Sequence, residues 1–443
     1  MAWALLLLCA AMAVPLVSPF ASPPSTPSTV LFPARAYSIH PSFTALYPHP
    51  PSSSSSQTPR AHRVSQLPHR AALLPRRRLD QSIRRRATTP LALRAHDTPY
   101  PAGVYNPSTA DSYFASRPLV IPQRALEILT TSLPLALDLW RSGVGGESQA
   151  EALKATLSRL GPTFVKVGQA LSVRSDLLPP EHVAALQELQ QAVEPFDSEV
   201  AMEVVRADIG LTPQGLRSMF PSVSPEPVAS ASLGQVYKGS FANGTQVALK
   251  VQRPGLEEVI AADLWILRAL EPVLSRFPLF QGVGTYTAVV DAWGKGFVDE
   301  LDYRKEASNS QRFLESMVER GLDGAITSPE VYPGASGRRV IATRWVDGTP
   351  LDRAEGGEVG GLCALALNAY LTMMLDSGTL HCDPHPGNML ATPDGRLCIL
   401  DWGLVLQVDP DLQYSLVDYI SHLITQDAEA IPGDLVALGF VDK

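Results

Sequence analysis

Three polar residues near the C-terminal end of the sequence have the types and spacing that phosphate chemistry requires. Asp383 is followed five residues later by Asn388, and Asp401 comes directly after the apolar run Leu397-Cys398-Ile399-Leu400. In phosphoryl transfer, an aspartate orients the attacking oxygen while further oxygen ligands hold Mg²⁺ against the phosphates. We therefore predict that Asp383 is catalytic and that Asn388 and Asp401 bind Mg²⁺.

Lys250 is the candidate for contacting the phosphates of ATP. It ends the run Val247-Ala248-Leu249-Lys250, which is close to the V-A-I-K pattern of protein kinases, in which a strand lysine meets the nucleotide phosphates. A lysine at the end of an apolar strand is more often a solvated edge residue. The Asp383 segment further along the chain, with a kinase-like Asp-to-Asn interval, favours the nucleotide interpretation.

A lysine in this role needs an acid on a following helix to hold it. The sequence offers Glu300, Asp302 and Glu306, although a charged helix face is the plainer interpretation of the group. Glu300 and Glu306 are six residues apart and so cannot share one role. We favour Glu306 as the partner of Lys250.

The loop that should cover the phosphates is poor in glycine. Where a kinase carries G-x-G-x-x-G, this chain has Ala229, Ser230, Ala231 and Ser232, and only Gly234 remains. Side chains restrict the approach of backbone N–H groups to phosphate oxygens, because the conformational freedom of glycine is lost. We predict that the site binds its nucleotide in an altered way.

A transition-metal cluster is the alternative interpretation of the catalytic segment, with His381, Cys382, Asp383 and His385 as its ligands. Structural zinc usually draws paired Cys or His ligands from two separated segments. The sequence contains no second set, so we favour phosphate chemistry.

Composition divides the chain into a basic leader and an acidic remainder. The length of 443 residues is enough for two or three domains, and a hydrophobic share of 45% excludes a wholly disordered protein. Residues 1–95 carry eleven Arg, no Lys and the single acid Asp80, whereas the whole chain has a net charge of −8. The remainder is therefore strongly acidic, which argues against a nucleic-acid partner.

The first hundred residues have the composition of a targeting sequence. Residues 4–17 form an apolar stretch like a signal peptide, and a Ser-, Pro- and Arg-rich segment follows. This order resembles a two-part plastid presequence, so we predict a plastid location, with the mitochondrion as the alternative. No later apolar run is long enough to span a bilayer, and any contact with a membrane or lipid-droplet surface is expected to be peripheral.

Hydrophobic periodicity predicts an α+β, protein-kinase-like two-lobed fold with an N-terminal helical extension. Helices are expected at 125–141, 149–160, 180–192 and 198–209, then at 257–274, 285–317 and 361–375. Strands are expected at 236–241, 245–251 and 339–345, with a hairpin at Asn243-Gly244. The predicted domains are a presequence and linker (1–104), the helical extension (105–222), an N-lobe (223–345) and a C-lobe (346–443).

These segments together resemble the UbiB/ADCK family of atypical kinases, also called ABC-one kinases. The family's K-x-G-Q motif matches Lys166-Val167-Gly168-Gln169, and its A-A-A-S loop matches residues 229–232 with Ser at the second position. Its E-x-D motif matches Glu300-Leu301-Asp302, and its strand lysine matches Lys250. The resemblance covers the chain from about Tyr105 onward.

The resemblance implies that the K-x-G-Q helices cover the site where a peptide substrate would bind, so a protein acceptor is not expected. It implies a Mg²⁺-dependent ATPase acting in prenyl-lipid or quinone metabolism. Lys166 and Gln169 would lie at the covered site and engage Glu300 or Asp302. The hinge that meets adenine would comprise Arg344, Trp345, Val346 and Asp347.

Three departures from the family pattern stand out. Trp402 replaces the usual Phe after Asp401, and Arg344 stands where an acid is common. Only 42 residues follow Asp401, which predicts a shortened C-lobe.

We predict an ATP-binding atypical kinase or ATPase that uses Mg²⁺. One alternative is a nucleotide-sensing regulator or lipid-handling partner that binds without turnover. Another is a small-molecule phosphotransferase, which shares the H-x-D-x-x-x-x-N logic but does not account for the K-x-G-Q motif.

Overall fold

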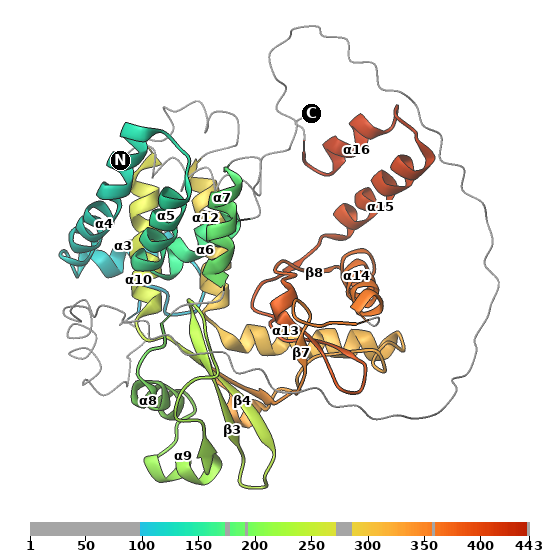
Figure 1. Cartoon of the computed structure of the whole chain (residues 1–443), viewed down its shortest axis with the longest axis horizontal. Helices are drawn as coiled ribbons and strands as arrows, with labels where there is room; N and C mark the ends of the chain where they lie inside the picture. Colours follow the sequence, from blue (N-terminus) through green and yellow to red (C-terminus); the bar gives the residue numbers. More distant parts are fainter. Residues whose placement is uncertain (1–97, 173–177, 191–193, 272–285, 357–358, 441–443) are drawn as a thin grey trace, which may run out of the picture. The chain divides into compact units, whose positions relative to one another are not determined.

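The structure, a computed structural model, describes residues 98–172, 178–190, 194–271, 286–356 and 359–440. The targeting sequence predicted for residues 1–104 lies almost entirely outside the described residues. From residue 98 onward, helices dominate up to residue 219, a sheet follows, and the C-terminal part is again mostly helical (Figure 1).

The strand that carries Lys250 belongs to a five-stranded sheet. The hairpin of β3 (Gly234–Ser240) and β4 (Gln246–Gln252) forms as predicted, with Gly244 at a φ of 86° and the Asn243 side chain accepting the N–H of Thr245. The hydrogen-bonded order is β1-β3-β4-β6, and β2 also pairs with β3. The remaining strands are β1 (Ser222–Val223), β2 (Ala229–Ser230) and β6 (Val340–Arg344).

One face of this sheet is covered by helices of the predicted extension. Alternate residues of β4, including Leu249 and Val251, are fully buried in a core that they share with Val204 and Val205 of α8 (Ser198–Asp208). The short helix α9 (Pro213–Met219) packs beside it. Because side chains alternate across a strand, Lys250 projects from the opposite face.

The other helices of the extension build two further cores. They are α3 (Pro107–Ala115), α4 (Val120–Ser142), α5 (Glu147–Leu160), α6 (Pro162–Leu171), α7 (Pro180–Gln187) and the 3₁₀ turn η2 (Glu188–Gln190). The large core of α4 to α7 and η2 and the smaller core of α3 both take in α10 (Leu256–Ala269) and α12 (Tyr286–Glu300), which follow the sheet in sequence. The two helices inserted after β4 therefore pack with the extension (Figure 1).

A buried ion pair ties α4 to α10. Arg124 Nε lies 2.7 Å from Asp263 Oδ1 and its Nη2 lies 3.0 Å from Oδ2, while Nη2 also donates to the carbonyl of Leu160 at 2.5 Å. Arg124 is 8% exposed and Asp263 is 1% exposed. A fork of this kind fixes the distance and rotation of two helices, because both charges are desolvated and each satisfies the other.

The single helix predicted for residues 285–317 is wrong. The chain instead forms α12, ending at Glu300, and α13 (Tyr303–Glu319). Asp302 has extended backbone and its side chain accepts the N–H of Arg304, so it caps α13, while the freed carbonyl of Leu301 accepts from the side chain of Gln252. Aspartate is a favoured N-cap, and the break places Glu300 and Glu306 on different helices.

The C-terminal part places the catalytic segment between short strands and helices. A four-stranded sheet has the order β5-β10-β9-β7, and β8 pairs with β11. Helix α14 packs against β8 and β10. Helices α15 and α16 come last in the described chain; α15 packs against α14, and α16 packs against α15. The bounds are β5 (Ile326–Thr327), η4 (Pro333–Ala335), β7 (Thr349–Pro350), α14 (Val359–Leu375), β8 (Thr379–His381), η5 (Pro386–Asn388), β9 (Met389–Ala391), β10 (Leu397–Ile399), β11 (Val405–Gln407), α15 (Pro410–Thr425) and α16 (Ile431–Ala437).

Within the described residues, every helix is too short or too polar to cross a bilayer. The domain boundaries at 105, 223 and 346 stay predictions.

Gly168 should be intolerant of substitution, because α6 packs closely there. A Cβ at this position would lie 2.5 Å from Leu189 Cδ1 and 2.9 Å from Leu157 Cδ1. In a helix, alanine is more stable than glycine by about 1 kcal/mol, but overpacking a core costs about 1–3 kcal/mol. Because the second effect is larger, Gly168→Ala should lower the free energy of unfolding measured in a urea titration. Gly361→Ala, at a helical position with open space, is the control and should not destabilise. Equal stability of the two variants would contradict the packing argument.

Candidate functional site

Lys250 joins three elements that are far apart in the sequence. Its Nζ lies 2.8 and 2.9 Å from the two carboxylate oxygens of Glu306 on α13, and 3.1 Å from Oδ2 of Asp401, which follows β10. It also lies 5.2 Å from the ring centre of Tyr303. The structure thus brings together Lys250, the acid favoured as its partner and one predicted metal ligand.

The two carboxylates respond differently to sharing one cation. Burial tends to raise the pKa of Asp401, but Lys250 and the N–H of Gly403 outweigh it and lower that pKa to about 2. For Glu306 burial dominates over Lys250, and its pKa rises to about 7. Burial tends to lower the pKa of Lys250, yet Asp401 and Glu306 together raise it well above its usual value. Asp401 therefore stays ionised near neutral pH, while Glu306 takes up a proton readily.

His381 connects the Asp383 segment to the Asp401 segment. Its Nε2 lies 2.6 Å from the main-chain oxygen of Asp401, and its Nδ1 accepts the N–H of Asp383 at 3.2 Å. A carbonyl can only accept and an amide N–H can only donate, so the buried ring carries its hydrogen on Nε2. The N–H of Cys382 donates to the carbonyl of Leu404 beside the paired strands β8 and β11. These bonds hold the exposed Asp383 near Asp401, and give His381 a role other than metal ligation.

Asn388 lies across from the residue before Asp401. It ends the 3₁₀ turn η5, and its main-chain oxygen accepts the N–H of Leu400 at 2.9 Å. The next residue, Met389, pairs with Ile399. An amide oxygen and an ionised carboxylate are hard oxygen ligands of the kind Mg²⁺ takes, so the donor types of Asn388 and Asp401 fit this ion.

Lys166 of the K-x-G-Q motif reaches the same region from α6. Its Nζ lies 2.8 Å from Oε1 of Glu300, whose side chain is 8% exposed. Burial tends to lower the pKa of Lys166, but Glu300 and, more weakly, Asp383 and Asp401 raise it. Of the two acids considered for Lys166, the structure selects Glu300. Gln169 is half-buried on the same helix.

Asp302 and the glycine-poor loop are both held by contacts to residues close to them in the sequence. Asp302 caps α13 and pairs with Arg304 at 2.6 Å, away from Lys166. In the loop, Ala229 and Ser230 form β2, and the N–H of Ala231 donates to the carbonyl of Gly234 at 2.8 Å, with Ser232 buried within this turn.

The retained Gly234 serves packing. A Cβ there would lie 2.5 Å from the carbonyl oxygen of Val251 and 2.8 Å from the hydroxyl of Tyr303. The Tyr303 hydroxyl is buried and forms no hydrogen bond within the part of the chain that the structure describes. The sequence pattern pointed to Gly234 as the remnant of a phosphate loop and gave no signal for Tyr303.

The predicted hinge residues lie at the end of β6. Arg344 of β6 pairs with Val247 of β4. Val247 lies three residues before Lys250, so the two are about 10 Å apart along the strand. The Arg344 side chain is exposed and pairs with Glu330 at 2.7 Å. Trp345 donates to Asp347 at 2.9 Å and its ring lies 4.4 Å from Lys238 Nζ; Val346 between them is half-buried.

Sequence inspection missed the groups that hold Trp402. This side chain is 2% exposed, its ring centre lies 4.2 Å from that of Phe313 of α13 with the two planes tilted by 33°, and its indole N–H donates to Ser328 at 2.8 Å. Asn309, also on α13, donates to the main-chain oxygen of Trp402 at 3.0 Å. The replacement of Phe by Trp was the available signal, because a buried indole N–H usually finds an acceptor.

The raised pKa of Glu306 predicts a pH-dependent stability. A carboxyl whose pKa is near 7 when folded and near 4.5 when unfolded costs folding free energy as pH rises through this window. Glu306→Gln lacks this cost. Urea titrations should show its free energy of unfolding improving relative to the wild type by on the order of 3 kcal/mol from pH 4.5 to pH 8. Glu315→Gln, exposed on the same helix, is the control. A constant difference across the range would contradict the assignment.

Comparison with known proteins assigns a family. A family model described as the ABC1 atypical kinase-like domain matches residues 188–434. Protein ACTIVITY OF BC1 COMPLEX KINASE 3, chloroplastic, of Arabidopsis thaliana is 35% identical over 352 residues, covering 77% of this chain and 48% of that protein. An uncharacterized protein of Synechocystis sp. is 35% identical over 348 residues, covering 76% of this chain and 50% of that protein. The chain thus spans about half the length of these relatives.

Among solved structures, the Rv3197–erythromycin complex of Mycobacterium tuberculosis is 28% identical with a TM-score of 0.45, covering 65% of this chain and 72% of that one. The match to an atypical kinase-like domain, together with the observed order of helices and sheets, confirms the prediction of a mixed α+β kinase-like fold with an N-terminal helical region. Because the matched domain covers more than half of the 443 residues, this chain belongs to the ABC1 atypical kinase-like family, also called UbiB.

Proposed function

We propose that this protein binds ATP together with Mg²⁺ and acts as an atypical kinase or ATPase. The observation that carries the proposal is the meeting of Lys250 with Glu306 and Asp401, which lie 56 and 151 residues away in the sequence. Burying a lysine is costly unless carboxylates compensate for it. A cation held in this way, beside an ionised aspartate, is suited to receiving phosphate groups.

Each residue of the cluster has a separate role in the proposal. Lys250 contacts the α- and β-phosphates of ATP, and Glu306 positions it. Asp383 orients the attacking oxygen of water or of a small-molecule hydroxyl and receives its proton, since a carboxylate in hydrogen-bond reach can act as the base. His381 keeps Asp383 and Asp401 in register through its two ring nitrogens.

Asn388 and Asp401 would hold Mg²⁺, which supplies neutralisation of the phosphate charge when bound. The low pKa of Asp401 keeps its carboxylate ionised for this purpose. One of its oxygens accepts from Gly403 at 2.9 Å and the other from Lys250, which fixes its orientation.

The acceptor in this proposal is not a protein. Lys166 lies on α6 and forms an ion pair with the buried Glu300, within the electrostatic reach of Asp383 and Asp401. In the proposal, α6 occupies the side from which a polypeptide acceptor would approach, so such an acceptor would have to break this ion pair, and breaking a buried pair costs about 3–5 kcal/mol. A small hydroxyl compound or water avoids that cost.

The physiological part of the proposal is a role in prenyl-lipid or quinone metabolism in a plastid, with peripheral contact to a lipid surface. It is supported by the family membership and by relatives whose names describe them as chloroplastic.

Asp383→Asn should separate turnover from binding. The amide preserves the shape of the side chain but cannot accept the proton, so ATP turnover should fall about 10²- to 10⁴-fold. Nucleotide affinity, measured by calorimetry with Mg-ATP, should stay within about threefold of the wild type. Asp418→Asn, an exposed position on α15, is the control. Turnover that survives in Asp383→Asn overturns the mechanism, and a wild type that binds but never hydrolyses ATP would favour the nucleotide-sensing alternative.

Loss of the protein should change the prenyl-lipid and quinone profile of its cells, and Asp383→Asn should not restore it. Lipid extracts from cells with the gene deleted, complemented by the wild type or complemented by the variant test this directly. Unchanged pools in the deletion strain would remove the metabolic role and leave the ATPase proposal standing.

A further inference from the structure

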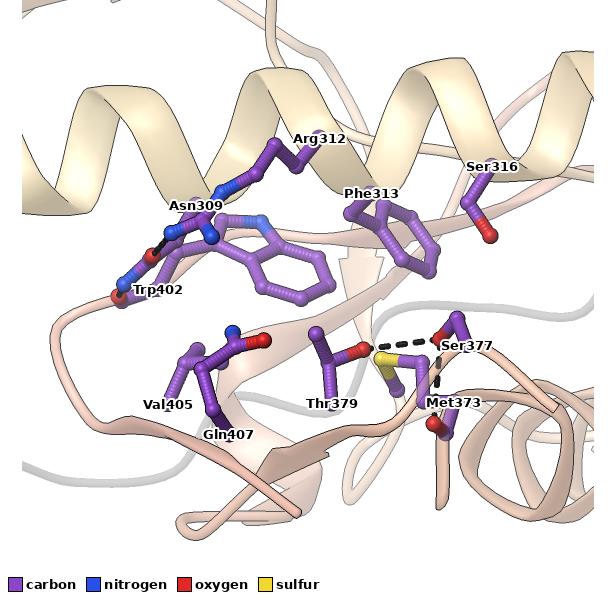
Figure 2. Close-up of a pocket in the computed structure, with 10 residues that line it drawn as sticks. All are labelled: Asn309, Arg312, Phe313, Ser316, Met373, Ser377, Thr379, Trp402, Val405 and Gln407. Carbon is purple, nitrogen blue, oxygen red and sulfur yellow. Dashed lines mark hydrogen bonds between the residues drawn. The ribbon is translucent and has the colours of Figure 1, made fainter. Parts of the chain in front are cut away.

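A cavity of about 180 Å³ lies behind Trp402, between α13 and the paired strands β8 and β11 (Figure 2). Its apolar lining includes Phe313 and Trp402, with Met373 and Val405. Phe313, Met373 and Trp402 are each less than 5% exposed, so this part of the lining is rigidly packed. None of the residues given a catalytic or metal-binding role above lines the cavity.

The volume selects the size of an occupant. An apolar cavity of about 150 Å³ in another protein is large enough to bind benzene. A space of about 180 Å³ therefore admits one six-membered ring with a small substituent, but not a second ring. The two aromatic rings of Phe313 and Trp402 in the lining favour an aromatic occupant, because aromatic pairs gain attraction beyond that of burial alone.

The polar lining selects the charge of the occupant. Arg312 lines the cavity, whereas no Asp or Glu does. Within the described residues Arg312 forms no ion pair, and its guanidinium donates only to the neutral side chain of Asn309, at 2.6 Å. Each hydroxyl of the lining already has a partner: Ser377 bonds to Thr379 at 2.8 Å and donates to the main-chain oxygen of Met373 (Figure 2), and Ser316 accepts from Arg320 at 2.8 Å.

We propose that this cavity is a binding site for a monocyclic aromatic carboxylate, whose ring contacts Phe313 and Trp402 while its carboxylate meets Arg312. The guanidinium can donate two parallel hydrogen bonds to a carboxylate, and here no protein acid competes for it. The site is separate from the proposed ATP site, although Trp402 is adjacent in sequence to Asp401. Binding does not depend on the proposed function.

Benzoate is the probe, with two comparison compounds of similar size. Benzyl alcohol keeps the ring without the charge, and cyclohexanecarboxylate keeps the charge without the aromatic ring. Ligand-observed NMR titration of the full chain should give a dissociation constant on the order of 1 mM for benzoate, as expected for a compound of nine heavy atoms. Both comparison compounds should bind more weakly.

Two pairs of variants locate the site. Val405→Phe fills the cavity and should weaken benzoate binding at least about tenfold, whereas Leu406→Phe, on the same strand with a 54% exposed side chain, should not. Arg312→Gln should weaken benzoate binding about threefold to fivefold and leave benzyl alcohol unchanged. Arg353→Gln, at another exposed arginine, is its control.

Each outcome bears on the proposal. Equal effects of Val405→Phe and Leu406→Phe would place benzoate elsewhere on the protein and overturn it. Equal affinity for benzoate and benzyl alcohol, or an Arg312→Gln variant that binds benzoate normally, would overturn the assignment of an anionic ligand. Because Arg312 is exposed, its variant keeps the test decisive even if Val405→Phe fails to fold. A protein that binds benzoate but not ATP would overturn the proposed function while supporting this site.

Discussion

The arrangement of this site depends on one shared cation. Lys250 is the lysine through which a β-strand, a helix and the loop after β10 meet, and both of its carboxylate partners lie at hydrogen-bond distance. Burial raises the pKa of both acids, but only at Asp401 do Lys250 and the N–H of Gly403 outweigh it, so the two pKa values separate, with Asp401 at about 2 and Glu306 at about 7. The consequence is one firmly ionised carboxylate beside one that protonates easily, which is a common feature of sites that handle charge.

This shared cation requires α13 to be held in place, and several contacts do so. Asp302 caps the helix, the N–H of Tyr303 donates to the carbonyl of Arg338, and Asn309 reaches the main chain of Trp402. The contact between the rings of Phe313 and Trp402 completes the connection between the helix and the segment that carries Asp401. The break between α12 and α13 is therefore part of the site, because it sets the position of Glu306 independently of Glu300.

The helical extension is coupled to the site through charge as well as packing. Arg124 and Asp263 bind α4 to α10 in a buried core, and α6 packs in the same core. From α6, Lys166 reaches Glu300 at the end of α12. Breaking a buried ion pair is costly, so this contact couples the position of α6 to that of α12.

The sequence alone determined the local features of this protein. The interval between Asp383 and Asn388, the hairpin at Asn243-Gly244 and the strand lysine Lys250 could be recognised because each depends on neighbouring residues. Glu306 could be preferred over Glu300 as the partner of Lys250, although the spacing of the two residues did not show that one helix ends at Glu300 and another begins at Tyr303.

Tertiary structure decided which distant groups meet. The choice of Glu300 for Lys166, the Ser328 acceptor for Trp402, the packing role of Gly234 against Tyr303 and the cavity beside Arg312 all depend on how separate elements pack. Side-chain type and spacing along the chain do not contain these distances, because burial and partner choice arise only when segments far apart in the sequence share one core.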